Sequence, residues 1–286
     1  MQSRDTARIA FIGGGNMARA LIAGLLRQGV APHRIRVGEP SAASRAGLQR
    51  DLGVVAEADN AAALVGADLV VLAVKPQDAG AALATLSDHG ATPNGAPLVL
   101  LSIAAGLRIA DLARLCPQGI GIVRAMPNRP ALLGAGITGL YAPAAVTAAQ
   151  RDLAELVGTA SGRAVWLRTE AELDIVTALS GSGPAYFFLL AESMAQAAEA
   201  LGLERATAML LARETLHGAG LLVHQDGSLA EQRAAVTSRG GTTEAALLVL
   251  QQAGFEALIA RALEAARARS AQLADTLAGD PHRKGL

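Results

Sequence analysis

Along the first 168 residues, short apolar runs alternate with stretches in which apolar residues recur at helical spacing. The strand-like runs are expected at Ile9–Ile12, Arg34–Pro40, Val54, Leu69–Val74, Leu98–Ala104, Ile120–Asn128, Ala135–Tyr141 and Ala164–Leu167. Strands that alternate with helices are typical of a doubly wound, mostly parallel sheet. The pattern therefore predicts an α/β domain over residues 1–168.

From about Glu170 the pattern changes to long stretches rich in Ala and Leu with helical periodicity. Helices are expected over 171–202, with a break at Gly181–Pro184, over 203–223 and over 256–277. Their apolar faces exceed what one small bundle can bury, and such a surplus usually marks a subunit interface. We therefore predict that residues 169–286 form an all-helical domain that makes a homodimer, or a higher oligomer of dimers.

Bulk composition narrows the classes of function. Hydrophobic residues make up 51% of the chain and charged residues 17%, which is typical of a globular protein. Basic and acidic side chains balance at 25 each, which argues against nucleic acid or an anionic membrane as a partner. No apolar run was found of the roughly 18–20 residues that span a bilayer. The sequence therefore predicts a cytoplasmic protein without nucleic-acid or membrane partners.

Cysteine and metal chemistry are sparse in the sequence. Cys116 is the only cysteine, so an internal disulfide is impossible, and it is expected to be a buried thiol at a helix end. No group of Cys, His or carboxylate residues has the spacing of metal ligands, so no metal is expected.

The segment ARIAFIGGGNMARALIAGLL carries the pattern Gly13-x-Gly15-x-x-Ala18 between a strand and a helix. Gly13 permits a tight turn, Gly15 lets the backbone approach a pyrophosphate, and Ala18 lets the helix pack on the strand. The N–H groups at the start of the helix then face the phosphates. We therefore predict a dinucleotide site formed by Gly13, Gly14, Gly15, Asn16, Met17 and Ala18.

More cofactor contacts are expected where the parallel strands end, because ligands of open α/β sheets bind outside the carboxyl ends of the strands. The candidates there are Ala73, Val74, Lys75, Pro76, Ala104 and Asn128. Lys75 is the only lysine ahead of Lys284 in a chain that uses arginine freely, which indicates a positional role. Asn60, just ahead of a helix, is either an N-cap or a cofactor contact.

The end of the second strand carries opposing signals on the choice between NAD and NADP. Glu39 lies where a carboxylate would bind the ribose hydroxyls of NAD and repel a 2′-phosphate. Ser41, Ser44 and Arg45 follow at once and offer groups that would hold that phosphate, although a helix cap beside an exposed arginine explains them at least as well. The residues alone leave this choice open.

The stretch VTSRGGTTEAAL, from Val236 to Leu247, interrupts the helical domain. A glycine costs a helix interior roughly 1 kcal/mol relative to alanine, so Gly240 and Gly241 predict a loop. The loop leads into a helix, whose first N–H groups and dipole suit a carboxylate. The alternative is a hydroxyl-capped turn between two helices.

Five motifs, in this order, resemble those of the pyrroline-5-carboxylate reductase family: IGGGNMA, AVKPQ, MPNRPALLGAG, ALSGSGPAYFF and VTSRGGTTEAALLVL. The resemblance spans roughly Ile9 to Leu273. The first two are shared by many dehydrogenases, whereas the SGSGPAY and TSxGGTT segments together are far more specific. The resemblance implies a Rossmann-type domain, a helical domain that interlocks with a second subunit, and an active site at the dimer interface. It also implies the reduction of 1-pyrroline-5-carboxylate to L-proline with NAD(P)H, the last step of proline biosynthesis.

The resemblance also implies residue roles. Thr243 would offer its hydroxyl to the ring nitrogen as the catalytic group, and the substrate-binding candidates are Ser238, Gly240, Gly241, Thr242 and Glu170. NADPH is favoured as cofactor, with Ser41 among its contacts, and NADH stays possible. Arg129 and Arg239 depart from the family pattern, which commonly has threonine and proline there.

Two other functions stay open: another NAD(P)H-dependent imine or 2-hydroxyacid-type reductase, and a non-catalytic dinucleotide-sensing dimer. Hydroxyacid enzymes of similar layout typically place a lysine on the helical domain, and this chain has none between Lys75 and Lys284.

Overall fold

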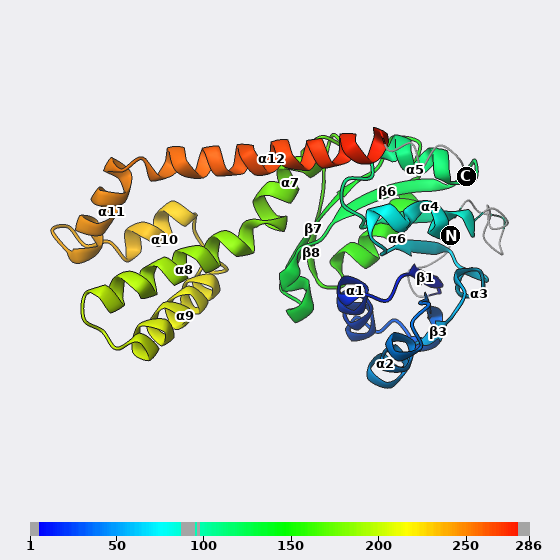
Figure 1. The fold of residues 1–286 in the computed structure, drawn as a ribbon, viewed down its shortest axis with the longest axis horizontal. Coiled ribbons are helices and arrows are strands. Elements are labelled where there is room, and N and C mark those ends of the chain that lie inside the picture. The colour runs from blue at the N-terminus through cyan, green and yellow to red at the C-terminus, as the bar shows by residue number, and fades with distance from the viewer. Residues whose placement is uncertain (1–5, 87–94, 96–97, 280–286) are drawn as a thin grey trace. The chain divides into compact units, whose positions relative to one another are not determined.

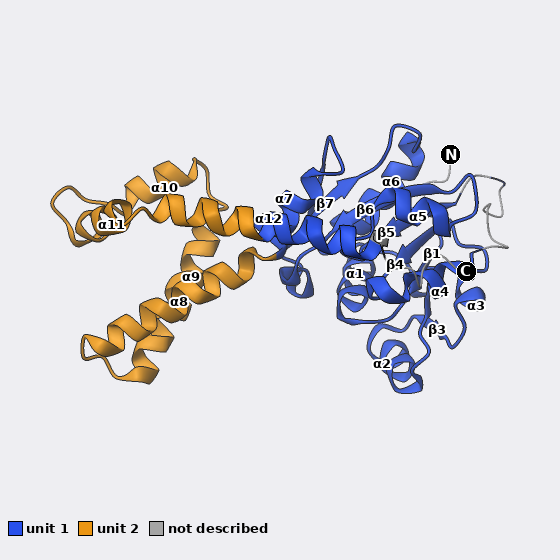
Figure 2. Cartoon of the chain, turned by 45° about the horizontal axis from the view of Figure 1, so that its top comes forward, with its two compact units in different colours: residues 1–181, 266–286 blue, residues 182–265 orange. Residues whose placement is uncertain are grey.

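The computed structural model describes residues 6–86, 95 and 98–279, which fall into two compact units (Figures 1 and 2). Unit 1 contains residues 1–181 and 266–286, and unit 2 contains residues 182–265. The domain boundary predicted between residues 168 and 169 lies inside unit 1, because the short helix α7 (Glu172–Val176) packs against the sheet. Lys284 lies outside the described residues.

Unit 1 is built on one sheet of eight strands in the order β3-β2-β1-β4-β5-β6-β7-β8. Only the β6–β7 pair is antiparallel, so the predicted doubly wound, mostly parallel sheet is confirmed. The strands are β1 Ile9–Ile12, β2 Ile35–Gly38, β3 Val55–Glu57, β4 Leu69–Leu72, β5 Val99–Ser102, β6 Gly121–Met126, β7 Gly136–Tyr141 and β8 Gly162–Trp166.

Helices cover both faces of this sheet (Figure 1). Two buried apolar clusters contain alternate residues of β1: Ile9 and Phe11 belong to one, and Ala10 and Ile12 belong to the other. Because both faces of the strands are buried, their sequences are continuous apolar runs. The α-helices of unit 1 are α1 Asn16–Arg27, α2 Ala42–Leu52, α3 Asn60–Leu64, α4 Ala79–Ala84, α5 Ile109–Leu115, α6 Ala148–Thr159 and α7. Short 3-10 turns occupy Pro32–Arg34, Pro76–Asp78 and Arg129–Leu133.

Helix α1 passes so close to the end of α6 that only glycine fits at position 24. A Cβ on Gly24 would overlap the backbone carbonyl of Ala160. In a solvent-exposed helix, Gly24→Ala would stabilise the helix by roughly 1 kcal/mol, because alanine has the higher helix propensity. Here the overlap with rigid backbone outweighs that gain, and we expect Gly24→Ala to lower the free energy of unfolding by about 1–3 kcal/mol. Urea unfolding followed by circular dichroism measures the change; a gain in stability would contradict the close approach.

Cys116 follows α5 as its C-terminal cap, as expected for a helix end. Burial raises the pKa of its thiol to about 12, because the apolar surroundings disfavour the thiolate. At neutral pH the side chain is therefore a protonated, unreactive thiol.

Unit 2 consists of helices with very little core of their own. A π-helical turn at Thr177–Gly181 leads into α8 Gly183–Ala200, so the predicted break at Gly181–Pro184 is present. The helices that follow are α9 Arg205–Leu222, α10 Leu229–Ala235, α11 Thr242–Gln252 and α12 Phe255–Gly279, which continues into unit 1. The buried cluster of unit 2 consists of Ala195, Ala208 and Ala212.

Large apolar side chains of unit 2 are exposed instead of buried. Phe187, Phe188 and Leu189 on α8 are 59–63% exposed, and Leu210 on α9 is 59% exposed. An exposed apolar surface of this kind marks a contact with another protein subunit.

The segment Glu172–Ala200 is long and apolar enough to cross a membrane by length and composition alone, contrary to the expectation from the sequence. The two successive helices Thr242–Gln252 and Phe255–Leu277 are long and apolar enough only when they are counted together as one bent span. The first segment contains the π-helical turn and the exposed face just described, so a subunit interface explains the same apolar residues.

Candidate active site

The strand register brings the predicted cofactor residues to one edge of the sheet. Ile12 at the end of β1 is level with Gly38 on β2 and Leu72 on β4, and Leu72 is level with Ser102 on β5. The segments that follow these four strands therefore meet outside the same carboxyl edge, as predicted. They contain the glycine turn, Glu39 to Arg45, Ala73 to Pro76, and Ala104.

The glycine turn has the geometry that its sequence predicts. Gly13 has φ +97°, its N–H donates to the carbonyl of Gly38 (2.9 Å), and an added Cβ would lie 2.7 Å from the carbonyl oxygen of Ala73. Gly15 is the N-cap of α1 and has open space around it. No side chain caps α1, and its first turn holds no acidic residue. The N–H groups of Asn16, Met17 and Ala18 therefore start a helix whose positive end suits a pyrophosphate.

Glu39 is tied to the glycine turn, a contact that the sequence did not predict. Its Oε2 accepts from the Gly14 N–H (3.0 Å), and its Oε1 accepts from the Ser41 N–H (2.9 Å). The Ser41 hydroxyl accepts from the Ser44 N–H as the N-cap of α2, and Arg45 Nη1 donates to the carbonyls of Glu39 and Pro40, each at 2.8 Å. The Glu39 carboxylate and the Arg45 guanidinium are thus each held by backbone groups at the end of β2, where a ribose would bind.

Three further candidates lie at this edge. Lys75 is exposed and precedes the turn Pro76–Asp78, and within the described chain its ammonium makes no recorded contact. Asp59, not Asn60, is the N-cap of α3, because the Asp59 carboxylate accepts from the Ala61 N–H (3.1 Å). The N-cap interpretation of Asn60 is therefore wrong. Asn60 packs instead against Gly38, where an added Cβ would overlap its Oδ1.

Asn128 is buried and its amide is committed to the protein. Its Oδ1 accepts from the Ile137 N–H (3.0 Å) on β7, and its Nδ2 donates to the carbonyl of Ser180 (3.1 Å) in the π-helical turn. These bonds give Asn128 a positioning role between β6, β7 and the π-helical turn. Its cofactor contact stays a prediction.

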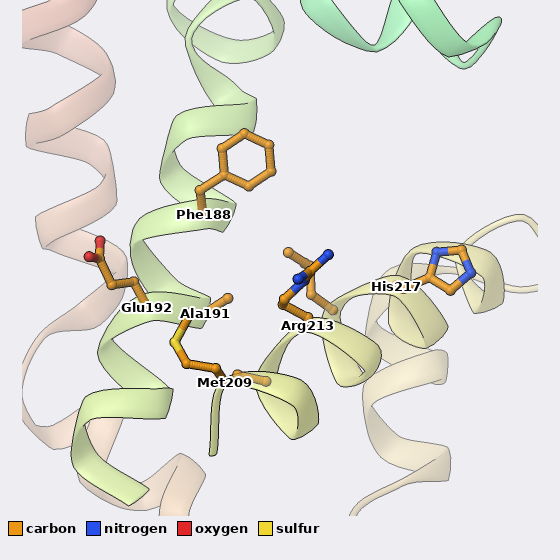
Figure 3. A pocket seen from close by; sticks show the side chains of 8 residues that line it. Phe188, Ala191, Glu192, Met209, Arg213 and His217 are labelled. Carbon is orange, nitrogen blue, oxygen red and sulfur yellow. The ribbon is translucent and has the colours of Figure 1, made fainter. Parts of the chain in front are cut away.

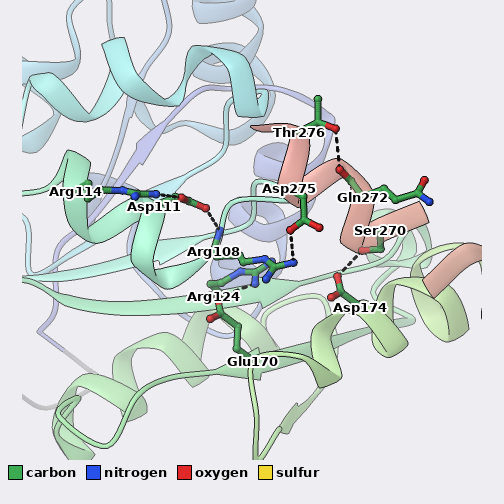
Figure 4. A network of polar contacts seen from close by, with 10 residues as sticks. All are labelled: Arg108, Asp111, Arg114, Arg124, Glu170, Asp174, Ser270, Gln272, Asp275 and Thr276. Atoms are coloured by element: carbon green, nitrogen blue, oxygen red, sulfur yellow. Dashed lines mark hydrogen bonds and ion pairs between the residues drawn. The ribbon is translucent and has the colours of Figure 1, made fainter. Parts of the chain in front are cut away.

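Glu170 sits in a polar network around α7 and the C-terminal part of α12 (Figure 4). Its Oε1 accepts from Arg124 Nη1 (2.8 Å), whose side chain is 11% exposed, and from the Ile109 N–H (2.7 Å) at the start of α5. Nearby, Ser270 donates to Asp174 (2.7 Å). The carboxylate predicted to bind substrate therefore also orders the start of α5, next to the segment that follows β5.

The hydroxyl-rich loop of unit 2 ends at a helix N-terminus, as predicted. Gly240 has φ +72°, and Gly241 is the N-cap of α11, which no side chain caps. An added Cβ on Gly241 would overlap Ser238 Oγ, so a side chain there would displace the Ser238 hydroxyl. Thr242 and Thr243 open the helix, and within the described residues the hydroxyl of the half-buried Thr243 is not in a recorded hydrogen bond.

Glu244 is a residue of this loop that the sequence reasoning missed. Its Oε2 accepts from the Gly240 N–H (2.7 Å), and the Gly241 N–H donates to the Ser238 carbonyl (3.0 Å). Both glycine N–H groups are thus used inside the loop, so the donors left at the start of α11 are the N–H groups of Thr242, Thr243 and Glu244. An acidic residue three positions after an N-cap is a sequence signal for a bond back to the N-cap N–H; here the carboxylate reaches the N–H one residue earlier.

A separate cavity of about 520 Å³ lies between α8 and α9 and holds none of the predicted site residues (Figure 3). Phe188 and Glu192 line it from α8, and Met209, Arg213 and His217 line it from α9. In the described part of the chain, no three His, Cys, Asp or Glu side chains gather as metal ligands would.

Comparison with known proteins bears on both units. The family described as "Pyrroline-5-carboxylate reductase dimerisation" matches residues 170–273, and the family described as "NADP oxidoreductase coenzyme F420-dependent" matches residues 8–106. The first match indicates a homo-oligomer and accounts for the exposed apolar helices. The pyrroline-5-carboxylate reductase of Pseudomonas aeruginosa is 48% identical over 275 residues, which cover 96% of this chain and 99% of the relative. That of Haemophilus influenzae is 40% identical over 267 residues, covering 93% and 97%.

Solved structures give the same result. A pyrroline-5-carboxylate reductase from Coxiella burnetii superimposes with a TM-score of 0.88 at 39% identity, over 94% of this chain and 98% of that one. The Plasmodium falciparum pyrroline carboxylate reductase with NADP bound superimposes with a TM-score of 0.78 at 26% identity, over 95% and 100%. With such identity over nearly its whole length, the chain belongs to the pyrroline-5-carboxylate reductase family.

Proposed function

We propose that this reductase converts 1-pyrroline-5-carboxylate to L-proline in the cytoplasm, as the last step of proline biosynthesis, with NADPH as preferred reductant and NADH as a possible substitute. The observation that carries the proposal is the start of α11, which no side chain caps. Thr242 and Thr243 present backbone N–H donors there, and within the described residues the Thr243 hydroxyl makes no hydrogen bond to the protein. A dinucleotide sensor has no need of such a second site.

The residues of unit 1 fit a nicotinamide dinucleotide, which supplies the hydride. In our proposal the N–H groups of Asn16, Met17 and Ala18 hold the pyrophosphate, and Gly13 keeps the turn tight enough for this approach. Ala73, Val74, Pro76 and Ala104 bound the carboxyl edge, and Lys75 places a positive charge there. Ser41 and Arg45 would face the 2′-phosphate.

The loop of unit 2 binds and orients the substrate. The helix N-terminus at Thr242 and Thr243 attracts the carboxylate, since the dipole of α11 places partial positive charge there. Ser238 and the glycines shape the loop so that its backbone comes close to a small ring. The Thr243 hydroxyl donates to the ring nitrogen. This hydrogen bond uses the lone pair of the neutral imine nitrogen and stabilises the negative charge that develops there as hydride reaches the neighbouring carbon, and water supplies the proton that completes the amine. Orientation and this one hydrogen bond then take the place of a tuned acid–base pair.

Turnover separates this proposal from its alternatives. Purified protein is mixed with NADPH and 1-pyrroline-5-carboxylate, and the loss of NADPH absorbance is followed. Steady loss with formation of L-proline supports the reductase. Binding of NADPH without turnover would favour the dinucleotide sensor, and turnover only with other imines or 2-oxo acids would favour the alternative enzymes.

Glu39→Ser tests the cofactor preference. Removing the carboxylate takes away a charge that repels a 2′-phosphate and frees the Gly14 N–H. We expect kcat/KM with NADPH to rise relative to NADH by about tenfold, which corresponds to roughly 1.4 kcal/mol. Side-by-side kinetics with both cofactors measures this ratio. An unchanged ratio would mean that the end of β2 does not select the cofactor.

A further inference from the structure

The loop between β5 and α5, residues 103–108, borders the carboxyl edge of the sheet where the cofactor is proposed to bind. Ala104 and Leu107 of this loop are buried, and Ala105 between them is exposed. Gly106 completes the turn with φ +79°, a backbone conformation that favours glycine. The part of the loop that a ligand can reach is therefore a short segment between two buried residues.

The Glu170 carboxylate holds the end of this loop. Its Oε1 accepts from the N–H of Ile109, the first residue of α5 (2.7 Å), and from Arg124 Nη1 (2.8 Å). Arg124 on β6 is level with Ser102, the last residue of β5, so it lies beside the strand that leads into the loop. Only 11% of the Arg124 side chain is exposed. Loss of the Glu170 carboxylate would therefore leave a nearly buried cation without this partner.

The C-terminal part of α12 packs against the tip of the same loop. An added Cβ on Gly106 would lie 2.8 Å from Leu277 Cδ1 and 3.6 Å from the backbone nitrogen of Ala274. Arg108 Nη2 donates to Asp275 Oδ1 (3.0 Å) (Figure 4). The loop is thus held by packing at its tip and by a carboxylate at its end.

We propose that Glu170 is a positioning residue for the cofactor: together with Arg124 it fixes the loop between β5 and α5, so that Ala104 and Ala105 keep their place at the cofactor edge. A carboxylate bonded to both a guanidinium and a backbone N–H holds these groups firmly, because the bonds are charge-assisted. A shift of about 1 Å in a site can cost on the order of a hundredfold in rate. The inference rests on the dinucleotide site of the proposed function. The substrate contact that the resemblance implies for Glu170 is the alternative.

Titration with NADPH, followed by the fluorescence of the nucleotide, tests this role without substrate. We expect Glu170→Ala to weaken NADPH binding roughly tenfold or more, since it removes two charge-assisted hydrogen bonds. Glu170→Gln keeps an oxygen that accepts from the Ile109 N–H but loses the charge, so it should recover part of the affinity. Glu172→Ala is the matched control, because the Glu172 carboxylate also accepts from backbone N–H groups, those of Arg168 and Thr169. This variant should bind NADPH as wild type.

The Arg124→Gln variant tests whether the ion pair acts as a unit. It should weaken NADPH binding about as much as Glu170→Gln, and the double variant should be little worse than either single one, because each change removes the same pair. Fully additive losses would overturn the pairing on which the proposal depends.

Steady-state kinetics separates positioning from substrate binding. At saturating NADPH, KM for 1-pyrroline-5-carboxylate should change less than about threefold in Glu170→Gln. A rise in this KM with wild-type NADPH affinity would overturn the proposal and make Glu170 a substrate ligand. Wild-type NADPH affinity in both Glu170→Ala and Glu170→Gln would overturn it as well.

Circular dichroism and melting temperature verify that the variants fold, and Glu170→Gln and Arg124→Gln carry the comparison if Glu170→Ala does not. A wild-type protein that binds NADPH without turnover would refute the proposed reaction only, since the NADPH titration still decides the role of Glu170. A wild-type protein that binds neither NADPH nor NADH would overturn both proposals.

Discussion

Leu189→Asp is expected to dissociate the homo-oligomer, a homodimer in our proposal, and to abolish reductase activity at assay concentrations. Leu189 lies on α8 and is 63% exposed, while the buried cluster of unit 2 is limited to three alanines. Burying a leucine side chain is worth about 1.5–3 kcal/mol. A two-fold dimer contains each residue twice, so the loss is roughly 3–6 kcal/mol, or on the order of a hundredfold to ten-thousandfold in dissociation constant.

Light scattering at the concentration of the assay measures the assembly directly. Val65→Asp is the matched control, because Val65 is similarly exposed (57%) but lies in unit 1, and this variant should stay dimeric. If the helical domains of two subunits intertwine, the Leu189→Asp monomer should also melt at a lower temperature. A stable and fully active monomer would contradict an obligate dimer.

The architecture of unit 1 could be predicted because its signals are local. Buried parallel strands are apolar at every position, so runs such as Leu69–Leu72 are recognised without knowing their neighbours. The turn at Gly13 requires a positive φ, and that requirement appears directly as glycine. Strand ends then locate the cofactor edge by topology alone. The antiparallel pairing of β7 has no such local signal.

Contacts between distant segments could not be predicted in the same way. Glu39 is bound to Gly14, 25 residues away, and Asn128 is bound to Ser180, 52 residues away. Their existence depends on how the strands and the π-helical turn come together, which periodicity does not encode. Asn60 and Asp59 show the same limit at short range, since both residue types favour an N-cap and only the backbone geometry decides between them.

The course of α12 is a further example. The periodicity of its apolar residues predicts a long helix, but it does not predict which part of the protein the end of the helix packs against. Ser270 donates to Asp174 (2.7 Å), and Arg108 donates to Asp275 (3.0 Å) (Figure 4). These bonds attach the C-terminal part of α12 to unit 1. A predicted boundary at one point of the chain therefore misses a unit made of two separate segments.

Thr243→Ala is expected to lower kcat by about tenfold to a hundredfold while leaving NADPH affinity nearly unchanged. The Thr243 hydroxyl has no recorded partner in the described chain, so it is available to the substrate nitrogen. One such hydrogen bond in a site closed to water is worth roughly 1–3 kcal/mol. The backbone donors at the start of α11 persist in this variant, so KM for the substrate should change less than kcat.

Two companion variants separate a hydroxyl effect from a change in the loop. Thr243→Ser restores the hydroxyl and loses only a methyl group, so it should recover much of the rate. Thr237→Ala removes a hydroxyl in the same loop that donates to the Arg233 carbonyl (2.7 Å), and it should keep nearly the wild-type kcat. A Thr243→Ala enzyme with the wild-type rate would mean that the imine arrives already protonated and that the loop only positions it. A loss of many thousandfold would exceed what one hydrogen bond supplies and would point to a second role for Thr243.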